Sequence, residues 1–166
     1  MIISSKRQPT ICRFGYTYYL TDNTRLTACY AWVVQYSGDA SSPDIPEHRP
    51  WQQLQWFEKK QWYSLMQYIR FEQRYRKRIS GEELIDGYNF NFRLRHNLAM
   101  TIPERKQIAP KIPYVFLNNE LHINFGKNIV DNYFDHTRLY GVIGYQCRSN
   151  LSANVGYMYM FQQLPP

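Results

Sequence analysis

The sequence predicts an all-β protein, a single antiparallel up-and-down meander of about eight strands. Three observations carry this prediction. Aromatic residues make up 17% of the 166 residues, and aromatic residues favour strands. Apolar and polar residues alternate along several runs, as expected when successive side chains point to opposite faces of a sheet. Clusters of Gly, Pro, Asn, Asp and Ser separate these runs, and such residues favour turns.

Alternation defines the first four expected strands. Residues 10–20 and 25–36 each place aromatic and aliphatic side chains on one face, and the polar run Thr21-Asp22-Asn23 separates the two strands. Residues 48–58 form a strand rich in Trp and Gln that ends at two lysines. Residues 61–76 form a long, charged strand. A helix is the less favourable alternative for this segment, because Trp, Tyr and Phe are weak helix formers.

The next four expected strands follow the same rule. Residues 88–101 have mostly aromatic and aliphatic side chains at even positions, and Asn, Arg, Ala and Thr at odd positions. This segment therefore has one apolar face and one strongly polar face. Residues 114–125, 136–148 and 151–162 alternate in the same way.

The expected connections differ in length. Those at 21–23, 59–60 and 149–150 are short, and those at 37–46, 77–87, 102–113 and 126–135 are longer and contain Gly or Pro. Short turns at one end and long loops at the other are typical of an up-and-down meander and of an outer-membrane barrel. The long connection at 102–113 departs from this alternation.

Two features favour a transmembrane barrel, with the apolar face outward against outer-membrane lipid and a girdle of aromatic residues. The polar faces of the strands carry Arg, whereas Lys lies mainly in turns and loops. The expected strands are also long enough for a tilted crossing, which needs about 9–11 residues, whereas typical soluble strands have about 5–6. A soluble lipocalin-like barrel that binds an apolar ligand remains the alternative, because alternation does not say which face lies inside. The lysines in question are Lys59, Lys60, Lys77, Lys106, Lys111 and Lys127.

The polar faces of neighbouring strands contain Arg together with Glu and His. In a barrel these side chains would line the lumen and form ion pairs, since planar Arg forks suit carboxylates in a sheltered interior. The network would offset buried charge, or would bind or pass a small solute or anion. The expected members are Glu47, His48, Arg49, Arg70, Glu72, Arg74, Arg93, Arg95, Glu120, His122 and Arg138.

The sequence favours no chemistry beyond this network. The three cysteines lie outside C-x-x-C pairs and the histidines lack H-x-x-x-H spacing, so we predict no metal site and no cofactor. We predict no catalytic residue and no enzyme. The remaining alternative is an outer-membrane lipid-modifying hydrolase that uses His122 and Glu120. The net charge of +7 raises nucleic-acid binding, which we do not expect because arginines and aromatic residues lie mostly on opposite faces.

Several short motifs carry a resemblance to a known family. They are Glu47-His48-Arg49 with Trp51-Gln52-Gln53-Leu54, Arg70-Phe71-Glu72-Gln73-Arg74, Arg93-Leu94-Arg95, Ile102-Pro103, Asn119-Glu120-Leu121, the run F-D-H-T-R-L-Y-G from Phe134 to Gly141, and Gly156-Tyr157-Met158. In this order they resemble the domain-of-unknown-function 2490 family of bacterial proteins, whose members are thought to be small outer-membrane barrels.

The resemblance implies an outer-membrane location in a Gram-negative bacterium, with outer-membrane lipid and the barrel-insertion machinery as partners. It also implies strands and a signal peptide ahead of Thr10, and a last strand after Gly156-Tyr157-Met158. No signal peptide is visible in residues 1–5, since a charged segment followed by an apolar core is missing. We therefore expect residues 1–166 to be one barrel domain that is truncated at both ends.

Overall fold

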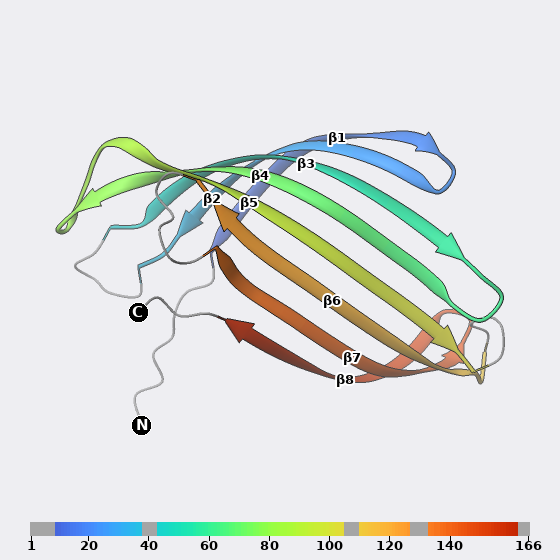
Figure 1. Cartoon of the computed structure of the whole chain (residues 1–166). Helices are drawn as coiled ribbons and strands as arrows, with labels where there is room; N and C mark the ends of the chain where they lie inside the picture. Colours follow the sequence, from blue (N-terminus) through green and yellow to red (C-terminus); the bar gives the residue numbers. More distant parts are fainter. Residues whose placement is uncertain (1–8, 38–42, 105–109, 127–132, 163–166) are drawn as a thin grey trace, which may run out of the picture.

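The computed structural model describes residues 9–37, 43–104, 110–126 and 133–162 (Figure 1). They form one antiparallel sheet of eight strands in the order β1-β2-β3-β4-β5-β6-β7-β8. The all-β meander predicted from the sequence is confirmed, and the helical alternative for the fourth segment is wrong. The strands are β1 Thr10–Thr21, β2 Thr24–Gln35, β3 Ile45–Lys59, β4 Ser64–Ser80, β5 Glu83–Pro103, β6 Pro113–Phe125, β7 Phe134–Arg148 and β8 Leu151–Gln162.

Each strand pairs only with its neighbours in the sequence. The sheet curls into an open trough, and β1 and β8 form its two edges (Figure 1). Within the described residues, these two strands do not pair with each other. The eight strands thus form a curved wall that is not closed into a barrel.

The two faces of this wall differ in polarity. We call the face that carries Glu47, Glu72 and His122 the inner face; all three side chains are almost completely buried. We call the opposite face the outer face. It carries large apolar side chains that are exposed, such as Phe14 at 83% and Val155 at 81%. The sheet therefore buries its charged side and exposes its apolar side.

Few apolar side chains are buried in the described part of the chain. They are Ala31, Val33, Trp51, Ala99 and Val142. The buried polar and charged side chains are more numerous: Glu47, Arg49, Gln53, Gln55, Glu72, Arg74, Asn97, His122 and His136.

The connection predicted as a loop at 77–87 is instead the end of a long hairpin. Strand β4 continues to Ser80 and β5 begins at Glu83, so only a two-residue turn joins them. Gly81, with φ 60°, occupies the first turn position, as a type II′ turn requires. Gly87, whose φ is 95°, lies in the β-bulge that follows Lys77 and has no partner residue in β4. Two glycines with positive φ thus allow a segment that looks like a loop to pair.

Other boundaries differ less from the prediction. Strand β3 begins at Ile45 rather than at 48, and β5 ends at Pro103 rather than at 101. The middle parts of three expected loops, and with them Lys106 and Lys127, lie outside the described residues. The three cysteines, Cys12, Cys29 and Cys147, are free. Among the described residues, no helix is long and apolar enough to span a membrane.

Candidate functional site

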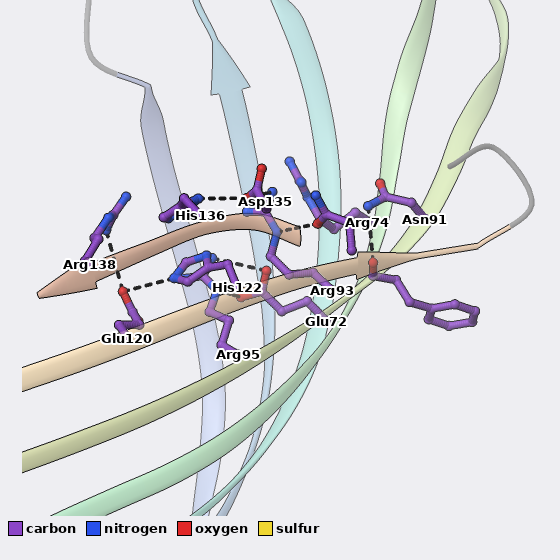
Figure 2. A network of polar contacts seen from close by, with 12 residues as sticks. Glu72, Arg74, Asn91, Arg93, Arg95, Glu120, His122, Asp135, His136 and Arg138 are labelled. Atoms are coloured by element: carbon purple, nitrogen blue, oxygen red, sulfur yellow. Dashed lines mark hydrogen bonds and ion pairs between the residues drawn. The ribbon is translucent and has the colours of Figure 1, made fainter. Parts of the chain in front are cut away.

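The polar residues of the inner face form a continuous band of ion pairs across β3, β4, β5, β6 and β7. The alternation of side chains along each strand places every second residue on this face. The register then sets them opposite one another, for example Arg70 against Arg95 and Glu120 against Arg138. Figure 2 shows the part of this band that spans β4 to β7.

Glu47 of β3 is the acceptor at the centre of the first cluster. Its side chain is 0% exposed. Arg74 of β4 donates through Nε to Oε1 at 2.7 Å and through Nη2 to Oε2 at 2.9 Å, which is a two-point contact. Arg49 donates to Oε1 at 2.8 Å, and the Gln35 amide donates to Oε2 at 2.9 Å. The negative charge of this buried carboxylate is therefore fully engaged.

Glu72 of β4 anchors the second cluster. Arg95 of β5 places Nε 2.9 Å from Oε1, and its Nη2 donates to Oε2 at 3.1 Å. Arg70 lies farther away, with Nη1 3.8 Å from Oε1. The guanidinium of Arg70 also lies 4.1 Å from the centre of the Trp51 ring and donates to Gln53 at 2.8 Å.

Glu120 of β6 anchors the third cluster. The Tyr68 hydroxyl donates to its Oε1 at 2.5 Å. On the other oxygen, Oε2, His122 Nε2 lies at 3.0 Å and Arg138 Nη1 at 3.6 Å. This carboxylate therefore links β4, β6 and β7.

A fourth cluster joins β5 to β6 and β7. Arg93 places Nη2 2.9 Å from Oδ2 of Asp135 and donates through Nε to Asn124 at 2.9 Å. His136 Nδ1 lies 2.9 Å from the same Asp135 oxygen. The ring of His136 faces that of His122 across the strand pair, with 3.9 Å between the ring centres.

A polar hollow of about 430 Å³ opens beside the fourth cluster. Three arginines line it, and Asp135 is the acidic side chain in its wall. Its lining residues are Arg74, Arg76, Asn89, Phe90, Asn91, Arg93, Asn124 and Asp135. Arg74 and Arg93 are already paired with Glu47 and Asp135. Arg76 lies farther from its acceptor, at 3.7 Å from Glu47, and is the guanidinium group best placed to meet a negatively charged group.

Comparison with known proteins gives one result. A family model described as a protein of unknown function, DUF2490, matches residues 4–166. The chain belongs to the DUF2490 family. No curated protein and no solved structure matches it.

The DUF2490 chain brings together all the predicted network residues except His48. Glu47, Arg49 and Arg74 meet in the first cluster, and the others lie in the clusters described above. His48 does not join, and its assignment to the network is wrong. It directly follows Glu47 on a strand, so its side chain points to the outer face. There Tyr30 Oη lies 2.5 Å from His48 Nδ1, and Tyr88 Oη lies 3.4 Å from Nε2.

Several members of the band lie outside the predicted network. Tyr68 and Arg76 are on the polar face of β4 and contact Glu120 and Glu47. Gln35 and Gln53 are neutral amides, which give no charge signal in the sequence. Asp135 could not be found by alternation, because it precedes His136 in the chain and yet shares the inner face with it.

Proposed function

We propose that this chain forms the wall of a β-barrel in the outer membrane of a Gram-negative bacterium, with the inner face lining a charged lumen. One observation carries the proposal, the inverted polarity of the sheet. Charged side chains such as Glu47 and Glu72 are buried, whereas aromatic and aliphatic side chains cover the outer face. An outward apolar band around a polar interior is the pattern of membrane barrels.

Strand length supports the same proposal. The strands contain between 12 residues, in β1, β2 and β8, and 21 residues, in β5. A tilted membrane crossing needs about 9–11 residues. Every strand is therefore long enough to cross, and the longest can project beyond the bilayer.

The soluble lipocalin-like alternative is disfavoured by the same polarity. A barrel of that kind buries its apolar face and keeps an apolar cavity for its ligand. In this sheet the apolar residues Leu117, Ile143 and Val155 are exposed, at 43%, 70% and 81%. An aqueous environment would leave this large apolar surface in contact with water, which is unfavourable.

The ion-pair band has a structural role in this proposal. Charges taken out of water are costly unless they are paired and hydrogen-bonded. Glu47, Glu72 and Glu120 each meet an arginine from a neighbouring strand. Arg93 of β5 donates to Asn124 of β6, so the band links every neighbouring pair from β3 to β7. We assign the band no catalytic role.

The polar hollow gives the lumen a place for a small anionic solute. Among its described lining residues, three arginines face one carboxylate, that of Asp135, and Arg76 is the least engaged of the three. The outer face would contact lipid, and the barrel-insertion machinery would assemble the protein. Assembly requires the free edges of β1 and β8 to be paired, because unsatisfied backbone groups are strongly unfavourable in lipid.

The membrane proposal is tested by exporting the chain in a Gram-negative host behind a cleavable export signal. We expect the chain in the outer-membrane fraction, resistant to extraction with urea and released only by detergent. The folded form should migrate differently from the boiled form on a gel. A soluble periplasmic protein with the same export signal serves as the control. Recovery of the chain as a monomer that stays soluble without detergent would contradict the proposal.

A further inference from the structure

Three side chains with metal-binding atoms converge on the inner face where β6 meets β7. They are His122, Asp135 and His136, and one ligand atom of each lies within 4.8 Å of the other two. Figure 2 shows them on neighbouring strands, with Arg93 and Glu120 beside them. We propose that this cluster binds a divalent transition-metal ion such as Zn²⁺.

A β-bulge brings the carboxylate into the cluster. His122 pairs with His136, but the next pair is Ile123 with Phe134, so Asp135 is an extra residue in β7. Without the bulge, Asp135 would point to the face opposite to that of His136. Bulges of this kind re-aim a side chain and recur beside functional sites.

The two histidines are buried without full hydrogen bonding. His122 is 2% exposed and His136 is 8% exposed. His122 Nδ1 and His136 Nε2 have no hydrogen-bond partner, and His122 Nε2 has only the contact with Glu120 Oε2 at 3.0 Å. Buried polar atoms rarely lack a partner in folded proteins, and coordination of an ion is one way in which such atoms are satisfied. A metal ion would satisfy one nitrogen of each ring.

The surroundings of His122 match those of metal-binding histidines. A ligating histidine commonly presents its second nitrogen to a carboxylate, which orients the ring. Glu120 Oε2 lies 3.0 Å from His122 Nε2 and can take this role, while Nδ1 is left for the ion. Arg93 and His136 both contact Oδ2 of Asp135, so this carboxylate is already held in place.

The donor set selects the kind of ion. Two imidazoles and one carboxylate suit Zn²⁺, Co²⁺, Ni²⁺ or Cu²⁺, whereas Mg²⁺ and Ca²⁺ prefer oxygen ligands alone. Bonds of about 2.0–2.2 Å to Zn²⁺ place ligand atoms roughly 3.3–3.5 Å apart around the ion. Binding would require side-chain rotations that reduce the observed spread of 4.8 Å to this value. Three protein ligands leave one coordination position for water or a solute.

Co²⁺ is the probe for the test, because its visible absorption reports the ligands. We titrate Co²⁺ into the folded chain, purified in detergent without a polyhistidine tag and stripped of metal. We expect one Co²⁺ per chain, a d–d absorption band, and displacement of this band by Zn²⁺. A folded chain that shows no Co²⁺ band, or that binds only several weak equivalents, would overturn the proposal.

Variants locate the ion. His122→Gln and His136→Gln should abolish the band, and Asp135→Asn, which preserves shape, should weaken the affinity. His96→Gln is the matched control, since His96 lies on the outer face of β5, and it should bind as the unmodified chain does. An unchanged Co²⁺ band in folded Asp135→Asn and His136→Gln, or its loss in His96→Gln, would refute the site. The Co²⁺ titration of the unmodified chain tests the proposal even if a histidine variant fails to fold.

Discussion

At the scale of single residues, the buried carboxylate of Glu47 links several strands of the sheet. Its carboxylate is 0% exposed and accepts hydrogen bonds from Arg74, Arg49 and Gln35. These partners come from β2, β3 and β4, so one side chain ties three strands together. Removing it leaves two buried guanidinium groups without their counter-charge.

Glu47→Ala should therefore lower the free energy of unfolding by about 3–5 kcal/mol, the usual cost of breaking a buried ion pair from one side. Glu58→Ala on the same strand is the control. Glu58 pairs with Lys60 at 2.9 Å, but both side chains are well exposed, at 43% and 57%. An exposed pair contributes little, so this variant should be nearly neutral. Urea unfolding in detergent micelles measures both changes, and equal losses would contradict the role given to Glu47.

At the scale of strands and turns, the sequence predicts much of what is observed. Alternation identified all eight strands, because a sheet with two unlike faces imposes a period of two. The same period places His48 on the face opposite to that of Glu47, so His48 shares a charge pattern with the network but not its face of the sheet. The bulge at Asp135 and the pairing of 77–87 depend on backbone geometry that alternation does not encode.

The tip of the β4–β5 hairpin gives a prediction of its own. Gly81 has φ 60°, and a Cβ added there would meet no atom within 4 Å. Gly81→Ala thus carries only backbone strain, about 1–2 kcal/mol. Because residues 78–85 pair only with each other, the effect should be local. We expect faster amide hydrogen exchange in this hairpin and unchanged exchange in β2 and β3. Glu82→Ala is the control, because Glu82 is the other turn residue and has no positive φ, so this variant should exchange as the unmodified chain does; equal effects of both variants would contradict this explanation.

At the scale of the whole molecule, the decisive property is which face lies inside. The sequence defines two faces but does not say which of them lies inside, because the alternation is the same in a soluble sheet and in a membrane sheet. In the structure, the curl of the sheet buries the Arg- and Glu-rich face. The curl also brings together side chains from strands that are not neighbours, such as Tyr68 of β4 and Glu120 of β6, and local patterns do not reveal such contacts.

Charged substitutions on the outer face should show whether this face contacts lipid or water. Leu117 lies in the middle of β6 and is 43% exposed, and Leu151 lies at the start of β8 and is 55% exposed. In a bilayer, Leu117→Arg should cost about 2–4 kcal/mol and Leu151→Arg about 0–1 kcal/mol, because the penalty falls toward the interface. In water, both changes would be nearly neutral. Folding yields in lipid vesicles measure the difference, and equal yields would argue against a membrane-facing surface.

The strict neighbour-to-neighbour pairing of the strands also has an evolutionary consequence. Every strand bonds only to the strands before and after it, so no segment is threaded between distant parts of the chain. Duplication or loss of one hairpin at an edge changes a single ladder of hydrogen bonds and leaves the other pairs in register. A lineage built on this plan can widen or narrow its sheet two strands at a time. In the barrel proposed above, the width of the lumen would therefore change between relatives without a change of architecture.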